Sequence, residues 1–307
     1  MSESGATSDS VAVNKAGEAV TESSKAGEGA ASEAGAASKA AATANDQAPQ
    51  EVLYDLTDGV ATITLNRPDL RNRLSIEALR ALHAALAQAA QDDEARVVVL
   101  TGTGNTFCAG ADLSGASSAA SEDKLWSGPR AIVNVLESIL DHPKPVIARV
   151  QGHVAGGGNG LVAACDLSVA VESAKFAFSE VRLGVAPAVI SVVCLRRMHV
   201  ADGYDLLLTG ERVSAERAVS SGLVNKVVED EALDAAVAVY IDQLRRGGPK
   251  ALAATKALLR RVPTMERTEA FEWTAELSAT LFASEEAQAG MGAFFKREPA
   301  PWAPHPS

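Results

Sequence analysis

The order of apolar and polar positions after residue 50 follows first a strand period and then a helix period. Val52–Leu56 and Val60–Leu65 alternate apolar with polar side chains, and Thr57-Asp58-Gly59 between them has the chemistry of a hairpin turn. From Ser75, which suits a helix N-cap, apolar residues recur at near-helical spacing toward Gln91. The pattern predicts two paired strands followed by an amphipathic helix.

Beyond residue 91 the chain alternates apolar strands with helices. Arg96–Thr101 is almost continuously apolar, which is typical of a parallel strand covered on both faces. The pattern predicts helices at Lys124–Leu140 and Asn159–Cys165, and extended segments at Val146–Val150, Leu167–Val171 and Phe176–Phe178. Strands and helices that alternate in this way predict an α/β core.

The last third of the chain is mainly helical. Pro249 suits the first turn of one helix, and Thr264 suits the N-cap of a long final helix that reaches about Ala287. The pattern predicts helices at Ala188–Arg196, Asp202–Leu208, Ser214–Ser221, Glu231–Arg246 and Lys250–Arg261, and a strand at Val224–Val228. We expect a core over residues 51–254 and a helical region over residues 255–307.

Composition separates the first 50 residues from the rest. More than half of Met1–Gln50 is Ala, Ser or Gly, and the segment contains no Leu, Ile, aromatic residue, Cys or Arg. Such a segment cannot bury enough apolar surface to fold, so residues 1–50 are expected to form a disordered tail. The remaining residues, roughly 257, suffice for one well-buried domain.

Charge and cysteine usage narrow the possible partners. The net charge is −11 and the pI is near 5.0, which argues against a nucleic-acid surface and against binding to anionic membranes. Cys108, Cys165 and Cys194 are widely spaced and contain no CxxC pair, and the histidines form no metal-binding pattern. The sequence has no apolar run near ~18 residues and no secretory signal pattern. We therefore expect a cytoplasmic protein without a metal site.

Two glycine-containing loops follow apolar strands and carry the candidate chemistry. Thr106–Leu113 is the first, and Val150–Leu161, with three consecutive glycines before a helix, is the second. Glycine lets a ligand approach the backbone closely, and a helix N-terminus favours a developing anion. Each loop alone could be only a tight turn. A dinucleotide fingerprint fails because Leu161 stands where glycine is required, and no Lys-Ser or Lys-Thr completes a P-loop.

Taken together, these loops and several other blocks resemble the crotonase superfamily, which includes the enoyl-CoA hydratases and isomerases. The resemblance runs from about Val52 to Trp302. It implies a crotonase-like spiral of ββα units, a helical C-terminal trimerisation region, a homotrimer or homohexamer, and an acyl-CoA thioester substrate. The blocks that carry it are Leu65–Pro68, Phe107–Leu113, Lys144–Ala148, Gly156–Gly158, Ala164–Leu167, Phe178–Gly184 and Leu208–Gly210.

The resemblance also assigns candidate site residues. Ala111 and Gly157 match the two backbone N–H donors that hold the thioester oxygen, and Glu180 matches a catalytic glutamate. Gly160 stands where many hydratases of the superfamily have their other glutamate. The substrate-binding candidates are Arg71, Ala109, Asp112, Leu113, Gly156 and Lys296, with Arg73, Lys256 and Arg297 as further candidates for contacts to CoA phosphates.

One catalytic carboxylate is compatible with several functions. The leading prediction is an enoyl-CoA hydratase that uses no metal or redox cofactor, since coenzyme A belongs to the substrate. The segment Ser179–Ser191 together with Gly160 resembles bacterial hydratases of the branched glutaconyl-CoA type. The loop around Ser114–Gly128 is expected to border the acyl pocket. A Δ3,Δ2-enoyl-CoA isomerase with Glu180 as proton shuttle and a non-catalytic acyl-CoA-binding subunit are the alternatives.

Overall fold

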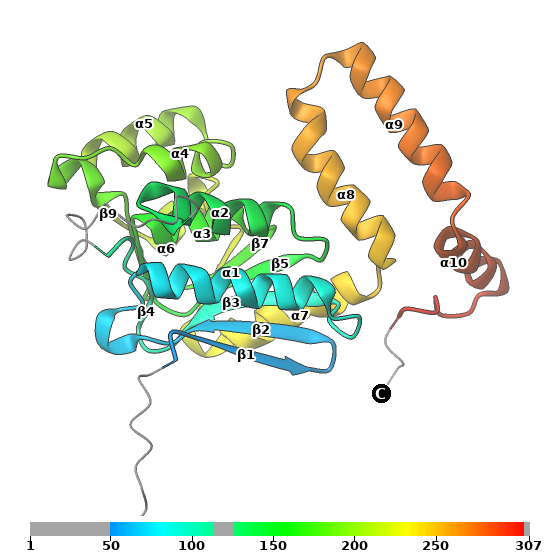
Figure 1. Ribbon diagram of the computed structural model, residues 1–307, viewed down its shortest axis with the longest axis horizontal. Coiled ribbons are helices and arrows are strands. Elements are labelled where there is room, and N and C mark those ends of the chain that lie inside the picture. Colours follow the sequence, from blue (N-terminus) through cyan, green and yellow to red (C-terminus); the bar gives the residue numbers. More distant parts are fainter. Residues whose placement is uncertain (1–49, 113–125, 304–307) are drawn as a thin grey trace, which may run out of the picture. The chain divides into compact units, whose positions relative to one another are not determined.

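The computed structural model describes residues 50–112 and 126–303 (Figure 1). Its strands make two sheets. The larger sheet has the order β1-β2-β3-β5-β7-β10 and contains β1 (Val52–Thr57), β2 (Val60–Leu65), β3 (Val97–Gly102), β5 (Val146–Val150), β7 (Leu167–Val171) and β10 (Lys226–Val228). The smaller sheet has the order β4-β6-β8-β9 and contains β4 (Thr106–Cys108), β6 (His153–Ala155), β8 (Lys175–Ala177) and β9 (Arg212–Ser214).

The larger sheet follows the predicted pattern closely. β1 and β2 pair antiparallel through the expected hairpin, and the remaining neighbours in this sheet pair in parallel. All six residues of β3 are buried, as continuous apolarity predicts for a central parallel strand. The predicted strand at Val224–Val228 is shorter, because β10 begins only at Lys226.

The smaller sheet is built from short strands that follow successive long strands of the larger sheet. Each of β3, β5 and β7 is followed by a three-residue strand, β4, β6 or β8, and these three strands pair in parallel. β4 was not predicted, and β6 lies inside a segment that was expected to be a loop. Three residues are too few for an alternating pattern to be visible in the sequence. The repeated unit is therefore long strand, short strand and helix or 3₁₀ turn.

The helices before residue 246 pack on the sheets, on one another or on a 3₁₀ turn. Their bounds are α1 (Ile76–Gln91), α2 (Pro129–Leu140), α3 (Gly157–Ala164), α4 (Ala188–Cys194), α5 (Val200–Thr209), α6 (Ala215–Ser220) and α7 (Leu233–Arg245), with 3₁₀ turns η1 (Pro68–Leu70), η4 (Ser179–Leu183) and η5 (Asp230–Ala232). The Ser75 hydroxyl accepts a hydrogen bond from the Ala78 N–H at 3.0 Å, which confirms the predicted cap. α2 begins five residues later than predicted, at Pro129.

The C-terminal region contains three helices where two were expected. They are α8 (Pro249–Arg261), α9 (Arg267–Phe282) and α10 (Glu285–Lys296), with η6 (Val262–Thr264) after α8. The prediction of one helix from Thr264 to Ala287 was wrong, because Ser284 caps a new helix by accepting from the Ala287 N–H at 3.2 Å. None of the residues of α9 is buried, and Phe271 on that helix is 70% exposed.

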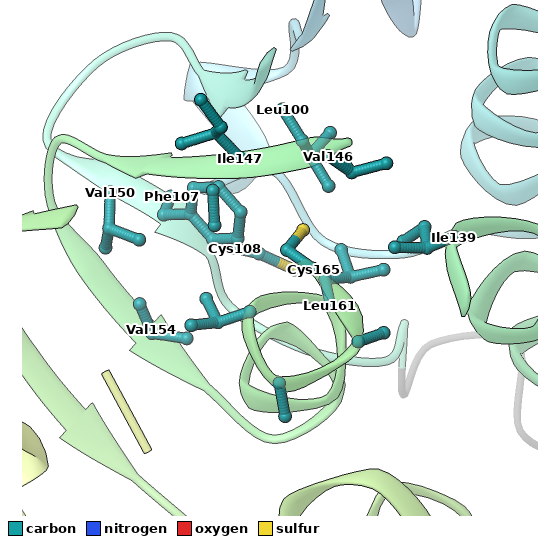
Figure 2. Packing of buried hydrophobic residues seen from close by; sticks show 14 of the residues in the cluster. Leu100, Phe107, Cys108, Ile139, Val146, Ile147, Val150, Val154, Leu161 and Cys165 are labelled. Atoms are coloured by element: carbon teal, nitrogen blue, oxygen red, sulfur yellow. The ribbon is translucent and has the colours of Figure 1, made fainter. Parts of the chain in front are cut away.

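The hydrophobic core lies where the two sheets and the first helices meet. Figure 2 shows Phe107 and Cys108 of β4 between β5 and α3, near Leu161 in that helix and Cys165 at its C-cap. Burial raises the pKa of the Cys108 and Cys165 thiols to about 12. These cysteines therefore act as small packing residues in the core where β4 and α3 meet.

Candidate active site

The loop after β4 forms a short parallel pairing with the segment that precedes α1. The Leu74 N–H donates to the Gly110 carbonyl at 2.7 Å, and the Asp112 N–H donates to the Leu74 carbonyl at 3.2 Å. In a trans peptide the carbonyl and the following N–H point to opposite sides. Because the Gly110 carbonyl faces Leu74, the Ala111 N–H points away from it and is directed out of the pairing.

Asn72 holds this pairing in place and was missed by the sequence analysis. Its side chain is 2% exposed, and its backbone has a φ of 52°, a conformation that Asn tolerates better than most residues. The side-chain oxygen accepts from the Arg67 N–H at 2.8 Å, while Nδ2 donates to the carbonyls of Thr103 and Thr106 at 2.9 and 2.7 Å. An asparagine shortly after an Asn-Arg-Pro turn was the available signal.

The second glycine loop brings a helix N-terminus to the same place. Gly156, with a φ of 49°, is the N-cap of α3, and Gly157 is its first helical residue, whose N–H has no acceptor within the helix. A Cβ atom on Gly110 would lie 3.2 Å from the Gly157 nitrogen, and one on Gly157 would lie 3.8 Å from the Ala111 nitrogen. The two loops therefore approach each other closely, and the backbone nitrogens of Ala111 and Gly157 are neighbours.

Glu180 supplies a carboxylate beside these backbone groups. It lies in η4, and a Cβ atom on Gly156 would be 3.3 Å from its Oε1. Its Oε2 is buried and has no hydrogen-bond partner in residues 50–112 and 126–303. Burial raises the pKa of the Glu180 carboxyl above its ordinary value. The arrangement combines a carboxyl group suited to proton transfer with two N–H groups suited to an oxyanion.

The end of α5 supports the turn that carries Glu180. Gly210 ends α5 with a φ of 62°, and a Cβ atom there would lie 3.1 Å from the Phe178 carbonyl oxygen. Arg182 reaches back from the same turn, and its Nε donates to the Thr209 carbonyl at 3.2 Å. The backbone around Glu180 is thus held from the side of α5 as well as from α3.

Neighbouring side chains fill the space beside Gly160. A Cβ atom on Gly160 would lie 2.6 Å from Cγ2 of Ile190 on α4 and 3.6 Å from Cδ2 of Leu136 on α2. The first of these distances is too short for any real contact. A glutamate at position 160 would therefore require the Ile190 side chain on α4 to shift, because that side chain fills the space where the glutamate would begin.

Of the other candidate residues, some lie beside these two loops and one makes no described contact with them. Ala109 is exposed, and its N–H donates to the Arg71 carbonyl at 3.0 Å, which places Arg71 beside the first loop. Asp112 forms an ion pair with Arg73 at 3.3 Å. Lys296 is exposed at the end of α10, and no interaction within the described segments joins it to these loops.

Two further predictions have different outcomes. Leu113 and most of the Ser114–Gly128 loop lie outside the described residues. Lys256, considered for CoA phosphates, is 8% exposed and its Nζ lies 2.6 Å from Oδ2 of Asp166. That interpretation of Lys256 was wrong, because the ammonium group is enclosed and paired inside the protein.

Comparisons with known proteins agree with this geometry. The family described as enoyl-CoA hydratase/isomerase matches residues 55–305. The chain belongs to the enoyl-CoA hydratase/isomerase family. It is 36% identical over 240 residues to enoyl-CoA hydratase EchA19 of Mycobacterium tuberculosis, covering 76% of this chain and 90% of that protein. It is 30% identical over 255 residues to a trans-2-decenoyl-acyl-carrier-protein isomerase of Streptococcus mutans, covering 81% and 97%.

Solved structures of the enoyl-CoA hydratase/isomerase family share the fold. An enoyl-CoA hydratase of Mycobacterium smegmatis superposes with a TM-score of 0.76 at 35% identity, covering 82% of this chain and 98% of that one. The fold is therefore the crotonase fold. In the described part of the chain, no group of three or more His, Cys, Asp and Glu side chains is placed to hold a metal ion. No helix of residues 50–112 or 126–303 has the length and apolarity needed to cross a membrane.

Proposed function

We propose that the protein is an enoyl-CoA hydratase that adds water across the 2-enoyl double bond of an acyl-CoA thioester. The observation that carries this proposal is the position of Glu180. Its carboxylate lies against Gly156, next to the N–H groups of Gly157 and Ala111, and one of its oxygens is buried without a partner among residues 50–112 and 126–303. An oxyanion and a proton-transfer group can therefore act on adjacent atoms of one substrate.

Each group has a distinct task in this reaction. Addition of water at C3 places negative charge on the thioester oxygen, and the N–H groups of Ala111 and Gly157 stabilise that enolate. Loss of one such donor typically lowers the rate by about 10²–10³-fold. Glu180 orients and deprotonates the water and then delivers a proton to C2. Its raised pKa suits a group that both takes and gives a proton near neutral pH.

A second candidate reaction is supported by the packing at position 160. Position 160 carries no carboxylate and Ile190 fills the space beside it, so among residues 50–112 and 126–303 Glu180 is the carboxyl group that lies against Gly156. Moving a double bond from C3 to C2 requires one base that removes a proton at C2 and returns it at C4. A Δ3,Δ2-enoyl-CoA isomerase is therefore the alternative, and one of the relatives carries the name of an isomerase.

Substrate contacts and assembly complete the proposal. Arg71 lies beside the first loop and is exposed, so it can meet a CoA phosphate, whereas the assignment of Lys296 rests on the resemblance alone. Phe271 and Phe282 on α9 are 70% and 63% exposed, and Phe294 and Phe295 on α10 are 78% and 80% exposed. Aromatic side chains exposed in such number favour contact with further copies, in a homotrimer or homohexamer.

The test compares Glu180→Gln with the wild type on a panel of 2-enoyl-CoA and 3-enoyl-CoA substrates. Turnover should fall by at least about 100-fold, since general acid–base groups contribute about 10²–10⁴-fold. Glu172→Gln is the matched control, because Glu172 is exposed in the turn between β7 and β8. Reaction in ¹⁸O-labelled water separates the two reactions, because only hydration incorporates the label. Near-wild-type turnover of Glu180→Gln would refute the assignment.

A further inference from the structure

Asn159 lies at the third position of α3 and is completely buried. Its Nδ2 donates to the Ala177 carbonyl at 2.8 Å. The Gly156 N–H donates to the same carbonyl at 3.1 Å. The Ala177 oxygen is therefore held by two donors, both from the start of the helix that presents the Gly157 N–H.

This bond connects the two halves of the proposed site. Ala177 ends β8, and Glu180 follows three residues later in η4. The turn is held from its other side by the end of α5, where Gly210 lies against the Phe178 carbonyl. A shift of Ala177 relative to α3 would therefore move the Glu180 carboxylate relative to the Gly157 N–H, because few residues separate them.

The side-chain oxygen of Asn159 destabilises the folded state. Its Oδ1 is buried and accepts no hydrogen bond within residues 50–112 and 126–303, so the Nδ2 donation is its one described side-chain bond. A buried acceptor without a donor destabilises the folded state, and an apolar side chain of similar size would avoid that cost. Retention of a polar group at such a place points to a role of the remaining bond in positioning.

We propose that Asn159 is a positioning residue, which fixes the separation between the Glu180 carboxylate and the Gly157 N–H by holding the Ala177 carbonyl. This inference rests on the proposed function of Glu180. Substrate binding depends mainly on other parts of the site, so the loss of the bond should act on the chemical step. A misplacement of about 1 Å can lower a rate by about 100-fold.

The experiment uses the full chain with Asn159→Ala and the nearly isosteric Asn159→Asp, whose carboxylate cannot donate to Ala177. We expect kcat to fall by about 10- to 100-fold in both variants, while KM stays within about threefold of wild type. In Asn159→Ala, which adds no charge, the pKa of Glu180 should fall toward its ordinary value, because a displaced carboxylate is better hydrated. It can be followed by NMR as the carboxyl signal that is absent in Glu180→Gln.

Ser168→Ala is the matched control for the loss of a buried hydrogen bond. Ser168 on β7 is completely buried, and its hydroxyl donates to Asn225 at 3.0 Å, away from the site. It should keep kcat within about threefold of wild type. The inference is wrong if folded Asn159→Ala retains near-wild-type kcat and an unchanged Glu180 pKa, or if Ser168→Ala loses as much turnover.

A failure of the proposed function gives a different result. In that case the wild type turns over none of the enoyl-CoA panel, and the Glu180 pKa alone decides the inference. A lowered Glu180 pKa in Asn159→Ala would support the positioning role. An unchanged pKa would overturn it independently of any activity.

Discussion

Replacement of Lys256 by Met tests how α8 is attached to the core. Lys256 is 8% exposed, and its ammonium group lies 2.6 Å from Oδ2 of Asp166 and 2.9 Å from the Lys144 carbonyl. The same Asp166 oxygen accepts from the Val146 N–H at 2.7 Å, at the first residue of β5. Met has nearly the volume of Lys, so the variant removes the charge without leaving a large cavity.

The magnitude follows from burial. Removal of one partner from a buried ion pair leaves the other charge uncompensated and costs about 3–5 kcal/mol. The Asp166 side chain is 28% exposed and keeps its bond to the Val146 N–H, so we expect the lower end, about 3 kcal/mol. In a domain of this size that lowers Tm by roughly 6–12 °C.

The same helix provides the control. Arg260 pairs with Asp141, but these side chains are 36% and 64% exposed, so Asp141→Asn should cost about 0–1 kcal/mol. The assay is urea unfolding followed by circular dichroism, at one protein concentration for all variants. A loss below about 1 kcal/mol in Lys256→Met, or an equal loss in Asp141→Asn, would refute the argument from burial.

Three more predictions concern acid stability, site geometry and the tail. Burial lowers the pKa of His142 to about 4, so as pH falls the unfolded chain binds the proton before the folded chain does. Between pH 6.5 and 4 the free energy of unfolding of the wild type should therefore fall by about 3 kcal/mol more than that of His142→Asn. Urea unfolding at a series of pH values measures this difference. Gly156→Ala should lower turnover in the same enoyl-CoA assay, whereas Gly184→Ala should not: both have positive φ, but only a Cβ on Gly156 meets Glu180. Deletion of residues 1–50 should leave turnover and the number of subunits per particle, measured by light scattering, unchanged, because the tail carries none of the site residues.

Local patterns predicted much of the secondary structure. The hairpin of β1 and β2, the capped α1 and the buried β3 depend on turn chemistry and side-chain period, which are properties of adjacent residues. β4, β6 and β9 were missed because three-residue strands have no measurable period, whereas β8 and β10 overlap predicted segments. The break between α9 and α10 was missed because one serine cap inside a helical pattern is a weak signal.

The candidate site was predicted in part. The glycine loops and Glu180 stand in motifs, so the resemblance identified them. The Asn-Arg-Pro turn before Asn72 was a signal for that residue, but local sequence does not show that Asn72 and Asn159 are buried and hold these loops. Lys256 was misinterpreted for the same reason. An isolated lysine in a helix is usually solvated, and its pairing with Asp166 depends on how distant segments pack.

The sequence by itself determined the order of the longer strands and of most helices, the family and the residues of the two loops. Only the tertiary structure decided that the Ala111 and Gly157 nitrogens are neighbours, that Glu180 lies against Gly156 and that Ile190 closes the space at Gly160. The physical reason is the range of the interactions. Turn and helix signals act between neighbouring residues, whereas burial, pKa and close approach depend on side chains far apart in the chain.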